Sequence, residues 1–230
     1  SQTMGEEGSG EEGTLKGVIK RLEERLRNEG DSHVRGAILY EIGSRLEAVG
    51  DERRAYDYFQ KALEVEPEFS PLYPALSVLL RRQARFTALL QVLREEAVSI
   101  QSGESKSWIL REIAQVHEFI QMNPATAQQV YFEALHSGGD SMVVLQDLER
   151  VVVPSRDWKL LEEALQNNLR LESGDSRRSG LHLELARLRE LRLRDREGAL
   201  TALQEGAAID GQGLLIRYEL LRHQWHQGPI

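Results

Sequence analysis

The sequence predicts an all-α protein built from consecutive antiparallel helix pairs. Leu, Ala, Glu, Arg and Gln dominate the 230 residues, and these residue types favour helices. Apolar residues recur at intervals of three and four, which is the spacing of one helix face. The same pattern also returns after a repeat length of about 72 residues, and long periods of this kind are typical of repeat architectures.

The repeat is visible at positions one repeat length apart that keep similar residue types. These sets are Asp51, Asn123 and Asp195; Ala55, Ala127 and Ala199; Phe59, Tyr131 and Leu203; and Ala62, Ala134 and Gly206. Each unit halves again, because Gly103, Gly139 and Gly174 follow one another at half the repeat length. The sequence therefore predicts three units, at 14–84, 85–156 and 157–226.

Each unit should hold four helices, so twelve are expected. Their predicted ranges are 14–28, 33–49, 52–65, 71–83, 86–100, 106–121, 124–136, 141–153, 157–171, 176–193, 196–208 and 212–226. Residues 1–13, "SQTMGEEGSGEEG", offer almost nothing to bury. They predict a disordered acidic tail ahead of a repeat region over 14–230.

Short polar motifs separate the predicted helices. Gly-Asp-Ser occurs at 30–32, 139–141 and 174–176, with Gly-Glu-Ser at 103–105. The glycine should adopt the left-handed conformation after a helix, and the Asp or Ser should cap the next one. Asp51, Asn123-Pro124 and Ser70-Pro71 predict the same kind of helix start. A catalytic serine would need a preceding strand and a partnered histidine, and the sequence predicts neither.

Residues 36–67, "GAILYEIGSRLEAVGDERRAYDYFQKALEVEP", resemble a tetratricopeptide repeat (TPR). The residues that carry the resemblance are Leu39, Ile42, Gly43, Leu46, Gly50, Ala55, Phe59, Ala62 and Pro67. Weaker copies occupy 109–135, with one extra residue before the second helix, and 182–207, where Gly206 replaces an alanine. The resemblance implies a right-handed superhelical solenoid of about six antiparallel helix pairs, whose first helices line a concave groove.

The composition argues against several kinds of chemistry. The chain has no cysteine, which excludes disulfides, thiolate metal sites and cysteine nucleophiles. His223 and His226 share a helical spacing but make only half a metal site. No phosphate-binding glycine motif occurs, and paired glutamates such as Glu95-Glu96 diverge around a helix. We therefore expect no catalytic residues, no cofactor and no metal, and hence no enzyme.

The net charge of −8 disfavours nucleic-acid binding, and no apolar run is long enough to span a membrane. No signal peptide opens this chain, so a cytoplasmic location is expected. Eight arginines fall between 170 and 196 with five acids interleaved. Pairing within the helices is the favoured interpretation, and a basic face for an acidic partner is the alternative.

The TPR resemblance also implies which side chains line the groove. Phe59, Phe86, Tyr131 and Trp158 keep repeat positions and are expected in the core. The groove side of the first helices should carry Tyr40, Ser44, Glu47, Trp108, Arg111, Gln115, Phe119, Arg187 and Glu190. Packing of Trp108 between repeats is the alternative for that residue. The Lys and Asn with which the family clamps a carboxylate are replaced by Tyr40 and Ser44, which argues against that activity.

These features predict a non-enzymatic scaffold that binds a protein or peptide segment in its concave groove. The alternative is a self-assembling module or a fragment of a longer repeat array. The last predicted helix supports the alternative, because it carries Leu214, Leu215, Tyr218, Leu221 and Trp225. An end repeat needs a polar outer face, so an apolar one suggests a homo-oligomer or a further repeat.

Overall fold

The structure is a computed structural model that describes residues 4–101, 103–138, 141–210 and 213–225. Every regular element within these ranges is a helix, and no strand occurs among them. The backbone forms two compact units, residues 1–99 and 100–230, and each is described by itself.

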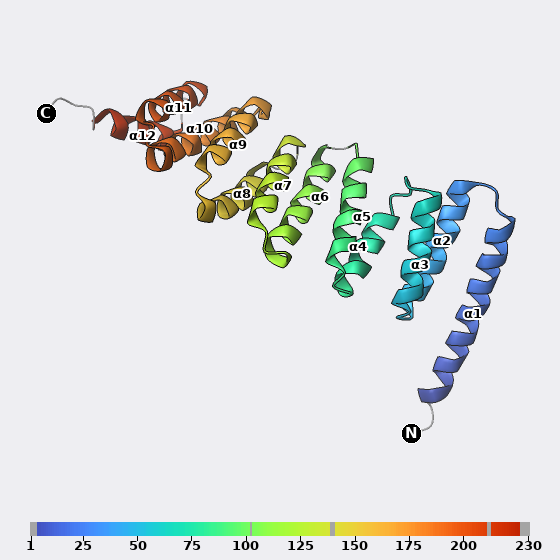
Figure 1. The fold of residues 1–230 in the computed structure, drawn as a ribbon. Helices are drawn as coiled ribbons and strands as arrows, with labels where there is room; N and C mark the ends of the chain where they lie inside the picture. Colours follow the sequence, from blue (N-terminus) through green and yellow to red (C-terminus); the bar gives the residue numbers. More distant parts are fainter. Residues whose placement is uncertain (1–3, 102, 139–140, 211–212, 226–230) are drawn as a thin grey trace. The chain divides into compact units, whose positions relative to one another are not determined.

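Unit 1 contains five helices, drawn from blue to green in Figure 1. They are α1 (Met4–Asn28), α2 (Ser32–Ala48), α3 (Glu52–Val65), α4 (Leu72–Arg82) and α5 (Phe86–Ser99). Helices α2 and α3 pack on one another most extensively, and α4 packs on α5. Helix α1 lies against α2, and α3 lies against α4, so each helix contacts its neighbours in the chain.

Unit 2 continues the pattern from green to red (Figure 1). Its helices are α6 (Gly103–Gln115), α7 (Pro124–His136), α8 (Ser141–Ser155), α9 (Trp158–Leu171), α10 (Asp175–Leu188), α11 (Arg196–Ile209) and α12 (Leu214–Trp225). Two π-helical segments, η1 (Val116–Ile120) and η2 (Arg189–Leu193), extend α6 and α10. The α6–α7 and α10–α11 pairs are the most tightly associated helices of this unit.

The predicted all-α architecture of antiparallel helix pairs is confirmed, with twelve α-helices in the described residues. The repeat register is also confirmed in the second helix of three pairs. Ala55, Phe59 and Ala62 of α3 are fully buried, as are Ala127, Tyr131 and Ala134 of α7. Ala199, Leu203 and Gly206 take the same places in α11. The fold is therefore a TPR-like repeat of helical hairpins.

The N-terminal boundary differs from the prediction. Helix α1 begins at Met4, within the segment 1–13 for which the sequence predicted disorder, and residues 1–3 lie outside the described range. Extending an existing helix costs much less than nucleating one, and glutamate is a good helix former. The three repeat units at 14–84, 85–156 and 157–226 stay a prediction, since the division into two compact units does not test them.

The π-helical segments explain the extra residue predicted in the later repeats. Gly43 corresponds to Ala114 and Asp51 to Asn123, and the second pair is separated by one residue more than the first. One residue is thus inserted between these positions in α6, and η1 follows directly from that helix. A π turn accommodates one extra residue without ending the helix. Segment η2 accommodates one extra residue after α10 in the same way, because Ala186 and Asp195 are as far apart in the sequence as Ala114 and Asn123.

Aspartate and asparagine cap the helices as predicted. Asp51 accepts a hydrogen bond from the Arg54 amide at 3.2 Å, and Asn123 accepts one from Thr126 at 3.2 Å. Asp31, within the first Gly-Asp-Ser motif, caps α2 through the Val34 amide at 3.0 Å. At the 174–176 motif the N-cap is Gly174 itself, which offers no side chain. Pro71 caps α4 without a side-chain bond, so Ser70 does not act as predicted.

The glycine part of the prediction is wrong at three of the four motifs. Gly174 has φ −82°, and neither Gly30 nor Gly103 has a positive φ. Residue 139 lies outside the described residues. Five left-handed residues lie instead at the turns within the hairpins: Gly50, Ala84, Met122, Arg156 and Arg194, with φ between 53° and 81°. Gly138, with φ 89°, lies between two hairpins, directly before the 139–141 motif. A left-handed residue ends the first helix of each pair and turns the chain toward the second helix, whether or not that residue is glycine.

Candidate functional site

The nine residues predicted for the groove all lie on first helices of hairpins, in two separate groups. Unit 1 holds Tyr40, Ser44 and Glu47 on α2. Unit 2 holds Trp108, Arg111 and Gln115 on α6, Phe119 on η1, Arg187 on α10 and Glu190 on η2. Each group is described within its own unit.

The unit 1 group is largely engaged in packing. The Tyr40 ring is half-buried, with its centroid 5.7 Å from that of Phe59 and 5.5 Å from that of Phe69. Ser44 Oγ donates to the Tyr40 carbonyl at 2.9 Å. Glu47 forms an ion pair with Arg82 of α4. These side chains stabilise the α2 surface and leave only part of it free for a partner.

The α6–η1 face of unit 2 is more open. Trp108 and Phe119 are 46% and 56% exposed, so each ring is partly packed and partly accessible. The Arg111 guanidinium carbon lies 5.3 Å from the Trp108 ring centroid, and that of Arg150 lies 5.2 Å from Phe119. Each exposed aromatic ring thus has an arginine cation over its face, where the ring quadrupole attracts the positive charge.

Both arginines are held by carboxylates in what we term the first charge cluster, Arg111, Glu118, Asp147 and Arg150. Arg150 binds both oxygens of Glu118, at 2.9 and 2.8 Å, and reaches Asp147 at 2.7 Å. Arg111 Nε donates to the other oxygen of Asp147 at 2.5 Å. Asp147 is only 5% exposed, so this cluster ties α6 and η1 firmly to α8.

The second charge cluster, Arg187, Glu190, Glu219 and Arg222, repeats this arrangement between α10–η2 and α12. Arg222 donates to Glu190 and to Glu219, in both cases at 2.6 Å. Arg187 donates to Glu219 at 3.4 Å. Glu190, Glu219 and Arg222 follow Glu118, Asp147 and Arg150 by one repeat length, so the repeat extends to the charged face.

Two pKa shifts reflect how the first cluster is bonded. Hydrogen bonding to Glu118 raises the pKa of Arg150, and Asp147 adds to the effect. Burial raises the pKa of Tyr131, whose hydroxyl donates to Glu118 at 2.7 Å. The bidentate pair with Glu118 holds Arg150 in one orientation.

The four aromatics predicted for the core divide into two kinds. Phe59 and Tyr131 are fully buried, as predicted. Phe86 and Trp158 are only half-buried, because each is the first residue of its helix, α5 and α9. Trp158 has the Arg192 guanidinium over its ring at 4.9 Å.

Pairing within helices does not account for the arginines of 170–196. Arg189 instead reaches Glu162 of α9 at 2.8 Å, and Arg187 reaches Glu219 of α12. No ion pair at three or four residues joins an arginine and an acid of this described stretch. Packing between helices, which sequence spacing alone does not specify, selects these partners.

Sequence reasoning missed the carboxylates and arginines that hold the predicted residues in place. Glu118, Asp147, Arg150, Glu219 and Arg222 were not predicted. The signal was nevertheless present, since Glu118, Asp147 and Arg150 each have an equally charged counterpart one repeat length later. Comparing charged as well as apolar positions between repeats would have identified them.

The described residues contain no group of three potential metal-ligating side chains, and His226 lies outside them. His223 is buried, with Nε2 3.7 Å from a Glu190 oxygen. None of the described helices has the length and apolar character needed to cross a bilayer.

The repeated hairpins and their charged first-helix face define a TPR-like helical repeat protein. No known family profile matches the chain, and no curated protein matches it. One similar solved structure is the C-terminal part of a TPR repeat-containing protein from Cytophaga hutchinsonii, at 14% identity and TM-score 0.47, covering 91% of this chain and 83% of that one.

Two further solved structures show a comparable similarity. PilF of Pseudomonas aeruginosa shares 16% identity with a TM-score of 0.43, covering 94% of this chain and 92% of that one. YrrB, described as a TPR protein with an unusual peptide-binding site, shares 12% identity with a TM-score of 0.40, covering 79% and 90%.

Proposed function

We propose that this protein is a non-enzymatic protein-interaction scaffold whose first-helix face holds a segment of a partner protein. The observation that carries the proposal is the α6–η1 face, where two exposed aromatic rings lie under arginines fixed by carboxylates. Aromatic residues and arginine dominate the binding energy of protein interfaces. Side chains held in place before binding lose little entropy when a partner docks.

The contact set proposed for unit 2 consists of Trp108, Arg111, Gln115, Phe119, Arg187 and Glu190. Tyr40, Ser44 and Glu47 are proposed to form a second, separate contact on unit 1. The first set presents more exposed aromatic surface, so we expect it to contribute more to affinity.

Selection from a displayed library of random short peptides, followed by binding measurements on variants, tests the proposal. Replacing Trp108 and Phe119 together by alanine should weaken the selected peptides at least about tenfold, since each such anchor is worth over about 1 kcal/mol. Arg111→Glu should have a similar effect, and Tyr40→Ala a smaller one. Leu171→Ala, an exposed apolar residue of α9, is the matched control.

Failure to enrich any peptide with intact protein would contradict the scaffold function. Equal affinity of the Trp108→Ala/Phe119→Ala variant and the control would place the binding surface elsewhere. Helix content measured by circular dichroism confirms that each variant is folded before binding is compared.

A second candidate function is self-assembly through α12. Leu214, Leu215, Tyr218 and Leu221 are 64–81% exposed and follow one helix face. A contiguous apolar stripe of this kind is typical of an interface, and a second copy of the chain is the occupant proposed here. Sedimentation over a wide concentration range tests it. A mass that rises with concentration and falls to the monomer value in Leu215→Glu supports it, and a constant monomer contradicts it.

A further inference from the structure

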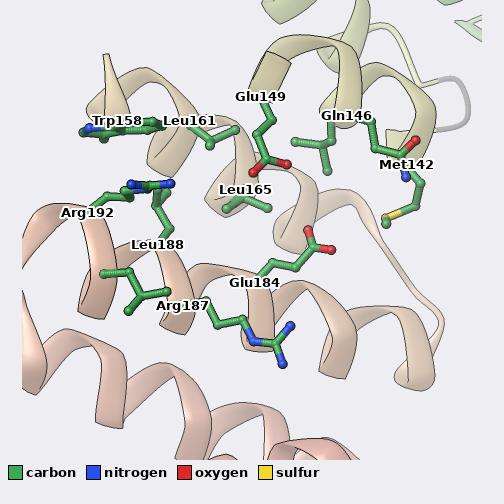
Figure 2. A pocket seen from close by; sticks show the side chains of 12 residues that line it. Met142, Gln146, Glu149, Trp158, Leu161, Leu165, Glu184, Arg187, Leu188 and Arg192 are labelled. Atoms are coloured by element: carbon green, nitrogen blue, oxygen red, sulfur yellow. The ribbon is translucent and has the colours of Figure 1, made fainter. Parts of the chain in front are cut away.

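A cavity of about 350 Å³ opens between α8, α9 and the α10–η2 helix of unit 2 (Figure 2). Its apolar walls come from all three helices. They are formed by Leu145, Leu161, Leu165, Leu188 and Leu191. A cavity of this size accommodates a large amino-acid side chain.

Two carboxylates face one another across the cavity. Glu149 extends from α8 and Glu184 from α10, and Figure 2 shows their carboxyl groups pointing toward each other. Neither forms an ion pair with another residue that the structure describes. Burial raises the pKa of the Glu184 carboxyl, and the charge of Glu149 raises it further. Both side chains are exposed in the free protein, and their like charges oppose one another.

The two cations that line the cavity are engaged elsewhere. Arg187 points away from Glu149 in Figure 2 and donates to Glu219 of the second charge cluster. It lowers the pKa of Glu184 but does not outweigh the opposing effects. Arg192 lies over the Trp158 ring at the far end of the cavity. The carboxylate pair therefore lacks a cation of its own.

We infer that this cavity binds an arginine or lysine side chain of a partner segment, between Glu149 and Glu184. The inference rests on the proposed scaffold function and names one side chain that the partner supplies. Arginine and lysine carry an apolar stem and a charged head, which match the leucine walls and the carboxylate pair. Charge-assisted hydrogen bonds to two carboxylates are among the strongest polar contacts in proteins. A neutral or acidic side chain satisfies only one of these two features.

The test uses the full chain and two defined peptides, acetyl-Ala-Leu-Arg-Leu-Ala-amide and the same peptide with citrulline in place of arginine. Citrulline keeps the shape of arginine and removes its charge. Leucine methyl signals of Leu161 and Leu165, followed by NMR during titration, report on the cavity. We expect saturable shifts with the arginine peptide and at least tenfold weaker binding of the citrulline peptide.

The matched variants are Glu149→Gln/Glu184→Gln and Glu104→Gln/Glu163→Gln. Both remove two exposed negative charges, but Glu104 and Glu163 lie outside the cavity. The first variant should lose at least tenfold in affinity for the arginine peptide, and the second should bind it like the unaltered protein. Both replace a carboxylate by an amide of the same shape, so the fold is retained.

Equal binding of the two peptides, an unaffected Glu149→Gln/Glu184→Gln variant, or no saturable shift with either peptide would each overturn the inference. None of these outcomes decides the scaffold function, which the peptide-library selection and the Trp108 and Phe119 variants test independently. If selected peptides bind the α6–η1 face without a basic residue, the scaffold function stands and the cavity assignment fails.

Discussion

Hairpin α2–α3 of unit 1 and hairpin α10–α11 of unit 2 have different side chains at the corresponding positions where their two helices pack together. In α2–α3, Gly43 lies against the Phe59 ring, and a methyl group added at Gly43 would sit 2.5 Å from that ring. In α10–α11 the corresponding residues are Ala186 and Leu203, both buried. The smaller Leu203 side chain leaves room for the methyl group of Ala186.

A second pair of positions shows the reverse change. Leu39 and Ala62 in the first hairpin correspond to His182 and Gly206 in the second. A methyl group on Gly206 would approach His182 Cβ to 2.7 Å and would also meet the tip of Ile216. The backbone of α11 thus lies too close to His182 and Ile216 for a side chain at 206, whereas α3 carries Ala62 at the corresponding position. Close-packed interiors couple such positions, so the degenerate repeat keeps its fold by paired changes.

The largest expected effect comes from filling the Gly43 position. Gly43→Ala should destabilise hairpin α2–α3 by about 2–3 kcal/mol, because the fully buried Phe59 ring has no room to move. Adding Phe59→Leu reproduces the Ala186–Leu203 pair and should recover part of the loss. Amide hydrogen exchange within α2 and α3 measures both effects.

The matched control for this substitution is Gly17→Ala in α1, where an added methyl group meets no atom within 4 Å. That variant should be neutral or slightly stabilising. A Gly43→Ala protein as stable as the Gly17→Ala protein would show that the first hairpin is not tightly packed at this position.

A smaller effect is expected at Gly206. Gly206→Ala should cost about 1–2 kcal/mol, since the flexible tip of Ile216 can yield in part. Ile216→Val removes that tip, so the double variant should recover about 1 kcal/mol. Gly180→Ala, also in the interior of a helix but with nothing within 4 Å, should stabilise α10 by up to about 1 kcal/mol. Urea unfolding of the unaltered protein, Gly206→Ala, Ile216→Val and the double variant tests the coupling between 206 and 216. Strictly additive changes in the free energy of unfolding would contradict it.

The turns of the two hairpins differ by one residue type at the same left-handed position. Gly50 has φ 81° and Arg194 has φ 57°. Arg194→Gly should therefore stabilise α10–α11 by about 1 kcal/mol, and Gly50→Ala should destabilise α2–α3 by about the same amount. Thermal unfolding of each variant checks the two signs. A loss of stability in Arg194→Gly would mean that its side chain contributes more than its backbone strain costs.

The smallest expected effect is a pH dependence from His182 of the second hairpin, where the first hairpin has Leu39. His182 is 7% exposed, and burial lowers its pKa below the ordinary 6.5, as do Arg178 and Arg189, while Glu205 opposes them. The unfolded chain therefore takes up a proton before the folded chain does, and stability is lost as the pH falls through about 6.5 and below.

Between pH 7 and pH 5 the unaltered protein should lose more stability than His182→Leu, which places at 182 the residue that α2 has at Leu39. Urea unfolding at each pH measures the difference, and the shared titration of all other groups cancels. An identical pH dependence in both proteins would show that His182 is protonated equally well in the folded state.

The sequence by itself determined the all-α class, the order of the helices and the register of the hairpins. Helix periodicity, the Asp51 and Asn123 caps and the spacing of Ala55, Phe59 and Ala62 are local signals, and each acts within a few residues. The exposed face with Trp108, Arg111 and Phe119 could also be placed on first helices, because the hairpin pattern sets which side of a helix is buried.

Only the tertiary structure decided which side chains meet across helices. The carboxylates that hold Arg111 and Arg150, the pairing of His182 with Gly206, and the cavity between Glu149 and Glu184 all join residues far apart in sequence. It also decided that Ala84, Met122, Arg156 and Arg194 turn in the left-handed conformation without being glycine. Such contacts depend on how whole helices pack, because packing energy can override the local preference of any one residue.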